Sequence, residues 1–303
     1  MLGGDNIVGI ITKGIGGFYY VATEGSAGTV ECRARGVFRK GGITPLTGDK
    51  VEISVEETAG KTCKGVVDKI LPRDNLLIRP PVANVTQMAV VVATVTPKPN
   101  FFGIDKLTVT ALSKGIKVLI CINKIDLSGS AEIEEIYTAA GFDVLRLSAE
   151  EGLNIDALLE KLEGNVTVFA GNSGVGKSSL LNCILGSDAL ETGELSEKIS
   201  RGKNTTRHSE ILKPERVNSG YVIDTPGFSS FDVSDITAES LERYFPEFAA
   251  ALGECYFTGC GHTGVKGCRV EEMVESGAIP RSRYDSYIQI YEVLKEIKPW
   301  EKK

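Results

Sequence analysis

Long apolar runs are missing from this sequence, since no stretch of its 303 residues approaches the roughly 18 apolar residues of a membrane-spanning helix. The first residues, MLGGDNIVGIITKG, lack the basic region and long apolar core of an export signal. An excess of basic charge is missing too, because the formal net charge is -6. That balance excludes a protein coated in basic charge for nonspecific nucleic-acid binding, but it allows a local nucleic-acid surface. We therefore expect a cytoplasmic protein that acts on no membrane.

Disorder and disulfides are not expected either. Hydrophobic residues make up 42% of the chain and charged residues 24%, which is typical of globular proteins. The length predicts about two or three domains. The seven cysteines are odd in number, and three of them lie between residues 255 and 268, which favours metal ligation. The other four lie in predicted strands or helices and are expected to be core residues: Cys32, Cys63, Cys121 and Cys183.

Residues 1–79 alternate short β-rich runs with glycine turns, as in GFYYVAT, GTVECRARGVF, GDKVEISVE and GVVDKILPR. Because no helical period interrupts them, we expect a small closed β-barrel. Roughly five strands in this length are typical of an OB-fold, an architecture that often binds oligonucleotides. The basic side chains of the barrel, such as Arg33 and Arg35, form either an RNA-binding surface or merely a solvated one. The following segment, LPRDNLLIRPPVANV, has paired prolines and is predicted to be a linker without regular elements.

Residues 80–232 alternate strands with helices. The runs QMAVVVATV, IKVLICINK and FDVLRLSA predict strands, and FFGIDKLTVTALSKG, AEIEEIYTAAG and NIDALLEKLEG predict helices. This alternation indicates βαβ units on a parallel sheet with helices on both faces. Residues 233–303 read as helical, with AESLERYFPEFAAAL and SRYDSYIQIYEVLKEI as the helical segments. The expected fold is therefore multidomain: an OB-like barrel, an α/β domain and a small helical domain.

The segment GNSGVGKS satisfies the phosphate-loop pattern G-x-x-x-x-G-K-[ST], and it has the required strand, VTVFA, before it and helix, SLLNCIL, after it. Backbone N–H groups of such a loop point at phosphate oxygens, and the helix dipole reinforces the site. We expect Lys177 to reach the terminal phosphates and Ser178 to bind Mg²⁺. A glycine-rich turn without a ligand is disfavoured, because strand, spacing, Lys-Ser pair and helix are all present. The nucleotide-binding residues predicted here are Gly171, Asn172, Ser173, Gly174, Val175, Gly176, Lys177, Ser178 and Ser179.

Two further motifs follow predicted strands. Asp224 opens DTPG, where its carboxylate would hold Mg²⁺ through water and Gly227 would turn its N–H toward the γ-phosphate.

NKID follows VLICI, and Asp126 could accept two hydrogen bonds from guanine, from a donor pair that adenine lacks. Asn123 would reach the opposite edge of the base, and the stem of Lys124 would lie over the ring. NKID alone could be a chance match, but its place at the end of a strand, where α/β sheets bind ligands, argues against chance. An ATPase is the other alternative, and NKID and the SA pair at residues 148 and 149 argue against it.

Ser148 and Ala149 end the next predicted strand and match the short loop that backs guanine in GTPases. The order NKID, SA, GNSGVGKS, a Thr-rich loop and DTPG resembles that of a circularly permuted GTPase. With the leading barrel and the trailing Cys/His segment, the whole chain resembles the RsgA family, also called YjeQ, of small ribosomal subunit biogenesis GTPases. The resemblance implies hydrolysis of GTP to GDP and phosphate, stimulated by the 30S subunit during its late maturation. It also implies contact with 16S rRNA, and we expect a monomer.

The stretch SRGKNTTRHSE resembles the first switch of that family, in which a Thr hydroxyl completes Mg²⁺ coordination. Thr205 and Thr206 are both candidates, and the sequence does not choose between them. DTPGF offers no Gln-like amide to orient the attacking water, so hydrolysis must be organised otherwise. His208 could position water or stabilise charge, or it could be an exposed loop residue without a role. Lys177 and His208 are the catalytic candidates, and a GTP-gated RNA-binding scaffold with negligible hydrolysis is the alternative function.

Cys255, Cys260, His262 and Cys268 form the pattern C-x4-C-x-H-x5-C. Three thiolates and one imidazole complete a tetrahedral shell for Zn²⁺ and leave no position for a substrate water, so one structural zinc ion is expected. The segment YFTGCGHTGVKG contains little apolar material, and metal ligation would supply its stability. Reduced cysteines without a metal are the alternative.

Overall fold

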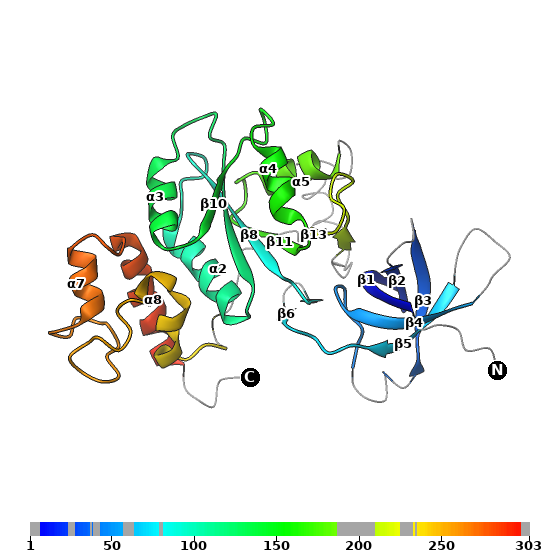
Figure 1. The fold of residues 1–303 in the computed structure, drawn as a ribbon, viewed down its shortest axis with the longest axis horizontal. Helices are drawn as coiled ribbons and strands as arrows, with labels where there is room; N and C mark the ends of the chain where they lie inside the picture. The colour runs from blue at the N-terminus through cyan, green and yellow to red at the C-terminus, as the bar shows by residue number, and fades with distance from the viewer. Residues whose placement is uncertain are drawn as a thin grey trace. The chain divides into compact units, whose positions relative to one another are not determined.

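A computed structural model of the protein describes residues 7–23, 28–36, 38, 43–56, 64–78, 81–186, 210–224, 233 and 235–297 (Figure 1). The chain divides into two compact units. The first comprises Met1–Thr86, Leu159–Val168 and Ile184–Pro226. The second comprises Gln87–Leu158, Phe169–Cys183 and Gly227–Lys303. The domain boundaries expected after residues 79 and 232 remain predictions.

The N-terminal strands form a closed barrel in the order β1-β2-β3-β5-β4. Its strands are β1 (Ile7–Ile15), β2 (Phe18–Thr23), β3 (Thr29–Ala34), β4 (Lys50–Glu56) and β5 (Lys64–Ile70). β3 and β5 pair in parallel, whereas the other pairs are antiparallel. Alternate side chains of these strands fill the interior, and its buried residues are Ile11, Val21, Val30, Cys32, Val51, Ile53 and Val67. The predicted barrel is confirmed.

The segment predicted to be a linker without regular elements contains a two-stranded sheet, so that prediction is wrong. β6 (Leu76–Ile78) pairs antiparallel with β7 (Pro81–Ala83), and Ile78 lies opposite Pro81. Pro81 is tolerated because it is the first residue of β7, a position at which strands accept proline. Leu77 and Val82 are 2% and 0% exposed, so burial of these two side chains outweighs the cost of the prolines.

The second sheet has six strands in the order β10-β9-β8-β11-β13-β12. Its strands are β8 (Gln87–Ala93), β9 (Lys117–Asn123), β10 (Asp143–Arg146), β11 (Val166–Ala170), β12 (Glu210–Leu212) and β13 (Tyr221–Asp224). β9 pairs in parallel with β8 and with β10, β11 pairs in parallel with β13, and β12 is antiparallel to β13. All seven residues of β8 are buried, as expected for a central strand covered on both faces.

Four helices accompany these strands: α2 (Phe101–Ser113), α3 (Ala131–Ala139), α4 (Ile155–Leu162) and α5 (Lys177–Leu185). Figure 1 shows α2 and α3 on one side of β8 and α5 on the other. Asn100 caps α2, because its side-chain oxygen accepts a hydrogen bond of 3.1 Å from the backbone N–H of Gly103. α2, α3 and α4 lie within the three runs that the sequence predicts to be helical.

The cysteines outside the Cys/His segment follow the prediction only in part. Cys32 and Cys121 are buried, Cys183 is half-buried, and Cys63 lies outside the described residues. Burial raises the pKa of the Cys121 thiol to about 12, which keeps it protonated in the core.

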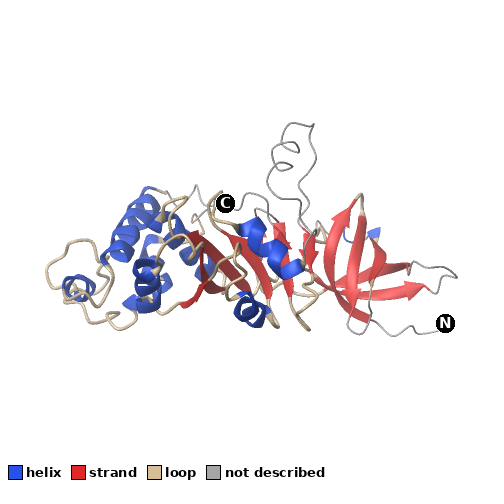
Figure 2. Cartoon of the chain, turned by 90° about the horizontal axis from the view of Figure 1, so that it is seen from above, coloured by secondary structure: helices blue, strands red, loops and turns tan. Residues whose placement is uncertain are grey.

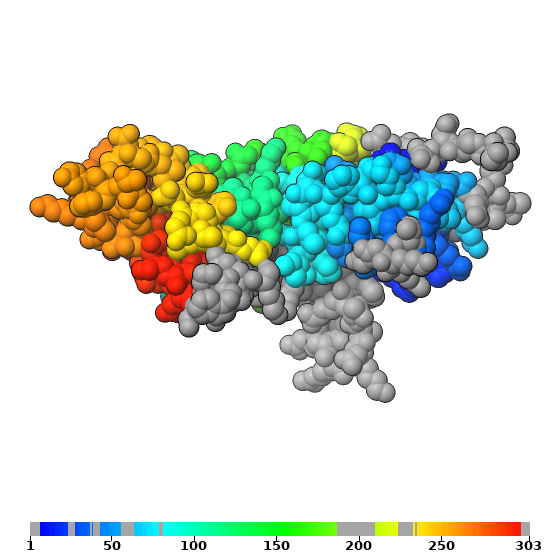
Figure 3. Space-filling view, turned by 90° about the horizontal axis from the view of Figure 1, so that it is seen from below, coloured from blue at the N-terminus to red at the C-terminus, as the bar shows by residue number. Residues whose placement is uncertain are grey.

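The C-terminal segment is helical and is coloured yellow to red in Figure 3. It contains the 3-10 helices η1 (Ala238–Tyr244) and η2 (Pro246–Phe248) and the α-helices α7 (Arg269–Glu275) and α8 (Arg281–Glu296). The run AESLERYFPEFAAAL was expected to form a longer helix, but Phe245 adopts an extended backbone and Pro246 starts a new turn. Figure 2 shows these helices grouped together. Within the described residues, no helix is both long and apolar enough to span a membrane.

The C-terminal helices share a hydrophobic core with α2. Its buried members include Val109 of α2, Leu241 of η1, and Phe245, Phe248 and Tyr287. The rings of Phe245 and Tyr287 meet edge to face at 5.2 Å, which is a favourable aromatic geometry. The helical segment and α2 are therefore packed as one body.

A charged network lies inside this core. Arg283 of α8 is 0% exposed and bonds Asp105 of α2 and Glu247 of η2, at 2.6 Å each. Tyr137 of α3 donates a further hydrogen bond of 2.8 Å to Asp105. Burial alone would lower the pKa of Arg283, but the two carboxylates outweigh it and raise that pKa above its usual value. Four elements of the second unit are thereby joined by buried charge.

Candidate nucleotide and metal sites

The GNSGVGKS segment forms a tight loop between β11 and α5. Gly171 has a φ of +143° and Gly176 a φ of +97°, a region that favours glycine. A Cβ atom at Gly171 would clash with the carbonyl of Val91, and one at Gly176 would clash with the amide of Asn123. The loop therefore lies directly against β8 and the end of β9, which only glycine permits at these positions.

Lys177 begins α5 and reaches back into the loop. Its ammonium donates hydrogen bonds of 2.7 Å to the carbonyl of Gly171 and 2.8 Å to that of Asn172. Ser173, Ser178 and Ser179 are exposed, whereas Val175 is buried. A cation, exposed hydroxyls and the N-terminal end of a helix are thus gathered at one loop, as an anion-binding site requires.

Asn123 ends β9 and connects the guanine motif to two other segments. Its side-chain amide donates 2.9 Å to the carbonyl of Val175 in the phosphate loop. Its side-chain oxygen accepts 3.1 Å from the backbone N–H of Ala149. Because Asn123 is only 1% exposed, both bonds lie in a low-dielectric setting. NKID, SA and GNSGVGKS, which are far apart in the chain, therefore meet at one side chain.

Lys124 and Asp126 are each held by hydrogen bonds, Lys124 to two backbone carbonyls and Asp126 to a side-chain hydroxyl. Lys124 has a φ of +65°, and its ammonium donates to the carbonyls of Thr96 and Gly174, at 2.5 and 2.7 Å. The exposed Asp126 carboxylate accepts a 2.5 Å hydrogen bond from the hydroxyl of Ser148, which is itself 0% exposed. The Asp126 carboxylate is thus oriented by a buried hydroxyl while remaining open to solvent, an arrangement that can accept hydrogen bonds from a base edge.

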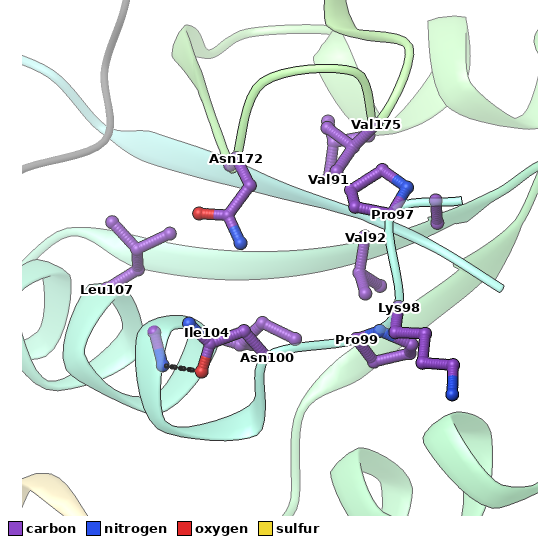
Figure 4. Close-up of a pocket in the computed structure, with 13 residues that line it drawn as sticks. Val91, Val92, Pro97, Lys98, Pro99, Asn100, Ile104, Leu107, Asn172 and Val175 are labelled. Carbon is purple, nitrogen blue, oxygen red and sulfur yellow. Dashed lines mark hydrogen bonds between the residues drawn. The ribbon is translucent and has the colours of Figure 1, made fainter. Parts of the chain in front are cut away.

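Sequence reasoning missed the segment between β8 and α2. Thr94 donates 2.9 Å to the carbonyl of Lys124, and Thr96 accepts from the Lys124 ammonium. Figure 4 shows a narrow pocket in which Asn172 and Val175 of the phosphate loop face Pro97 and its neighbours. The position of this segment after a buried strand, at the sheet edge where ligands bind, is a signal that could have indicated it.

Several predicted site residues lie outside the described residues. These are Thr205, Thr206, His208 and Gly227, and the side chain of Asp224 also lies outside. The backbone of Asp224 ends β13, opposite Glu210 of β12. The roles predicted for these residues remain predictions.

The four predicted metal ligands come together. Ligand atoms of Cys255, Cys260, His262 and Cys268 lie within 4.8 Å of one another. The Nδ1 atom of His262 is 3.4 Å from the sulfur of Cys268 and 3.6 Å from that of Cys255. Backbone N–H groups of His262 and Arg269 donate to the sulfurs of Cys260 and Cys255, at 3.4 and 3.3 Å. Three sulfurs and one imidazole nitrogen in this arrangement fit a tetrahedral zinc ion.

Burial has a chemical consequence at this cluster. Burial and the neighbouring thiols raise the pKa of Cys268 to about 12, so without a metal this residue is a neutral thiol. A bound Zn²⁺ ion would displace the thiol proton and supply the charge that stabilises the thiolate.

Comparisons with known proteins identify two family domains along the chain. The model of the RsgA GTPase matches residues 70–234, and that of the RsgA N-terminal domain matches residues 8–61. A small ribosomal subunit biogenesis GTPase RsgA from Ruminiclostridium cellulolyticum is 49% identical over 292 residues, which cover 96% of this chain and 94% of the relative. The protein of the same name from Clostridium kluyveri is 45% identical over 284 residues, covering 93% and 96%.

Solved structures show the same architecture. YjeQ from Thermotoga maritima has a TM-score of 0.83 at 35% identity, covering 97% of this chain and 100% of that one. YloQ, described as a circularly permuted GTPase, has a TM-score of 0.79 at 34% identity, covering 97% and 96%. The expected fold class is confirmed: a closed barrel, a circularly permuted GTPase domain and a helical region with a Cys/His cluster.

Proposed function

Because this chain belongs to the RsgA GTPase family, we propose that it hydrolyses GTP to GDP and phosphate during late maturation of the small ribosomal subunit. The reaction is hydrolysis of an acid anhydride by a P-loop GTPase. The observation that carries the proposal is the contact of Asn123 with Val175 and Ala149, because it brings the guanine motif, its backing segment and the phosphate loop to one place.

Guanine is selected by Asp126. Its carboxylate accepts hydrogen bonds from the N1–H and the exocyclic amine of the base, while Ser148 holds it from the protein side. Adenine cannot supply this donor pair, so an adenine nucleotide would leave the carboxylate unsatisfied. The stem of Lys124 lies over the ring, and its ammonium, bonded to Gly174, ties the base site to the phosphate loop. Asn123 hydrogen-bonds both the phosphate loop, at Val175, and the segment that holds Ala149, and it reaches the base edge. Ala149 lies behind the base.

The phosphates lie over the loop from Gly171 to Ser179. Backbone N–H groups and the start of α5 bind the phosphate oxygens, and Lys177 leaves the loop carbonyls to contact the terminal phosphates. Ser178, Asp224 and one of Thr205 and Thr206 would hold Mg²⁺, which would neutralise charge on the phosphates. Gly227 donates its N–H to the γ-phosphate. His208 orients the attacking water, in place of the Gln that DTPGF lacks.

The relatives are named small ribosomal subunit biogenesis GTPases, and these names support binding to the small subunit. We infer that the chain binds the 30S subunit as a monomer in the cytoplasm, contacts 16S rRNA, and carries one structural zinc ion at the Cys/His cluster. The subunit stimulates hydrolysis, and hydrolysis lowers affinity and releases the protein. A GTP-gated scaffold with negligible turnover is not favoured, because the relatives are named as GTPases.

Single-turnover hydrolysis tests this function. Purified protein is mixed with labelled GTP, with and without purified small subunits, and Lys177→Ala serves as the control. We expect phosphate release that the subunits accelerate and that Lys177→Ala abolishes. Retention of intact GTP in the presence of subunits would support the scaffold instead. Competition by ATP as effective as that by GTP would contradict the selection of guanine.

A further inference from the structure

A carboxylate outside the Cys/His segment contacts the back of the histidine ligand. The Nε2 atom of His262 lies 2.9 Å from a carboxylate oxygen of Glu242, which belongs to η1. The His262 side chain is 3% exposed and that of Glu242 is 29% exposed, so the contact is largely shielded from water. The other ring nitrogen, Nδ1, is the one that lies beside the sulfurs of Cys255 and Cys268.

We propose that Glu242 is a positioning residue of the metal site, which fixes His262 so that it binds zinc through Nδ1. Neutral imidazole has one protonated nitrogen and one nitrogen with a free lone pair. A carboxylate at 2.9 Å keeps the proton on Nε2, because only an N–H can donate to it. The lone pair of Nδ1 is then directed at the sulfurs, where the metal binds. This inference goes beyond GTP hydrolysis and depends on the zinc site proposed above.

The backbone of His262 is held for the same geometry. It has a φ of +55°, which is uncommon for a residue with a side chain. The hydroxyl of Tyr284 donates 2.9 Å to its carbonyl, and that of Tyr287 donates 3.1 Å to the carbonyl of Gly261. These bonds anchor the metal loop to α8 and keep the imidazole between Glu242 and the sulfurs. The His262 ring is thus fixed through its backbone by α8 and through Nε2 by Glu242, which distinguishes this contact from an incidental pair at the surface.

The contact with Glu242 also links the metal loop to a helix outside it. All four ligands lie within residues 255–268, whereas Glu242 belongs to η1, the first described helix after the DTPG segment. Zinc binding and the hydrogen bond between His262 and Glu242 therefore stabilise each other. The free energy by which zinc strengthens this bond equals the free energy by which the bond strengthens zinc binding. Outer carboxylates of this kind typically change metal affinity by about 10- to 100-fold.

Zinc affinity of the full-length protein tests the proposal. We would compare Glu242→Ala, Glu242→Gln and the wild type by competition with a chromophoric zinc chelator. Glu275→Ala is the matched control, because Glu275 is an exposed acidic residue of α7 in the same segment. We expect a loss of about 10- to 100-fold for Glu242→Ala. Glu242→Gln should lose less, because its amide oxygen still accepts from Nε2–H, and Glu275→Ala should be unchanged.

A second measurement, on the wild-type protein, determines which ring nitrogen of His262 binds zinc. Long-range ¹H–¹⁵N NMR spectra of the zinc-loaded protein distinguish a histidine bound through Nδ1 from one bound through Nε2, and they require no variant to fold. We expect Nδ1 coordination. Coordination through Nε2, failure of the wild type to bind zinc, or unchanged affinity in Glu242→Ala would each overturn the proposal. GTP binding by the same variants, which should stay unchanged, separates this outcome from a failure of the nucleotide site.

Discussion

The side-chain amide of Asn123 donates a 2.9 Å hydrogen bond to the carbonyl of Val175, 52 residues further along the chain. The same side chain accepts from Ala149. Circular permutation changes the order in which the chain visits these three segments, but this residue still joins them. The nucleotide site is therefore held together by a buried polar bridge, and its removal should affect base binding and the phosphate loop at once.

Asn123→Ala should weaken both the site and the fold. It leaves the Val175 carbonyl and the Ala149 N–H without their partner in a buried place, which costs roughly 1–3 kcal/mol. We expect GTP affinity to fall by about tenfold or more. Titration with a fluorescent GTP analogue and denaturant unfolding measure the two effects. Asn123→Asp should be at least as damaging, because it places a buried carboxylate against the Val175 carbonyl oxygen. Wild-type affinity in Asn123→Ala would contradict the bridge.

Ser148→Ala should lower nucleotide affinity. The substitution removes the hydroxyl that holds the exposed Asp126 carboxylate and that accepts a 3.1 Å hydrogen bond from the Glu151 N–H, but it leaves the hydrogen bond from the Ala149 N–H to the Asn123 side chain intact. A lost hydrogen bond to a charged group is worth roughly 1.5–3 kcal/mol, and we expect a drop of about tenfold in GTP affinity. Ser148→Thr retains a hydroxyl and is the control. The interpretation fails if the Ala and Thr variants bind GTP equally well.

His208→Ala should separate hydrolysis from binding. His208 follows the two switch threonines, and DTPGF supplies no amide to orient water. If its imidazole positions the attacking water, the subunit-stimulated rate should fall by roughly 100-fold at unchanged GTP affinity. Single-turnover phosphate release with purified subunits measures the rate. A variant that kept its full stimulated rate would show that His208 has no catalytic role.

Arg283→Met should be strongly destabilising. It removes the cation from a network in which Arg283 and Asp105 are both 0% exposed, and two buried carboxylates remain unpaired. Breaking such a buried pair costs roughly 3–5 kcal/mol. Arg281→Ala is the control, because Arg281 belongs to the same helix and pairs with Asp285 at the surface. Urea unfolding should show a large loss for Arg283→Met and little change for Arg281→Ala, and equal effects would contradict the role of burial.

Zinc removal should loosen the Cys/His segment while leaving the barrel folded. The segment between Cys255 and Cys268 is rich in glycine, so ligation is the main source of its order. Elemental analysis should give one zinc ion per chain. Hydrogen exchange with and without a chelator should show faster exchange in this segment and in η1, and unchanged exchange in β1 to β5. Absence of zinc from the purified protein would refute the site.

The loops that carry the motifs could be predicted from sequence because their information is local. GNSGVGKS combines fixed spacing with a strand before it and a helix after it, and NKID directly follows a buried strand. Both loops form where expected, and the four Cys/His residues converge as their spacing indicates. The contact between Asn123 and Val175 could not be predicted from local sequence patterns, because it depends on which strands become neighbours in the sheet.

The other differences have tertiary causes as well. Proline composition suggested a linker over residues 71–85, yet burial of Leu77 and Val82 makes two short strands favourable. The run AESLERYFPEFAAAL was expected to be helical, but it forms two 3-10 helices, because Phe245 is extended and Pro246 begins the second one. Glu242 and Arg283 lie in segments that the sequence predicts to be helical, but their partners, His262 of the metal loop and Asp105 and Glu247 of other helices, depend on tertiary packing. Local pattern identifies the elements, and packing decides which polar residues become internal.

The buried charges around Arg283 also determine how the helices can move. Apolar side chains can slide past one another at small cost, but a planar guanidinium forked between Asp105 and Glu247 fits only one setting of α8 on α2. A shift of α8 by one helical turn would separate these charges inside the core. Sliding of the zinc-site helices along α2 is therefore opposed by the cost of separating buried charges, a restraint that apolar packing alone does not supply.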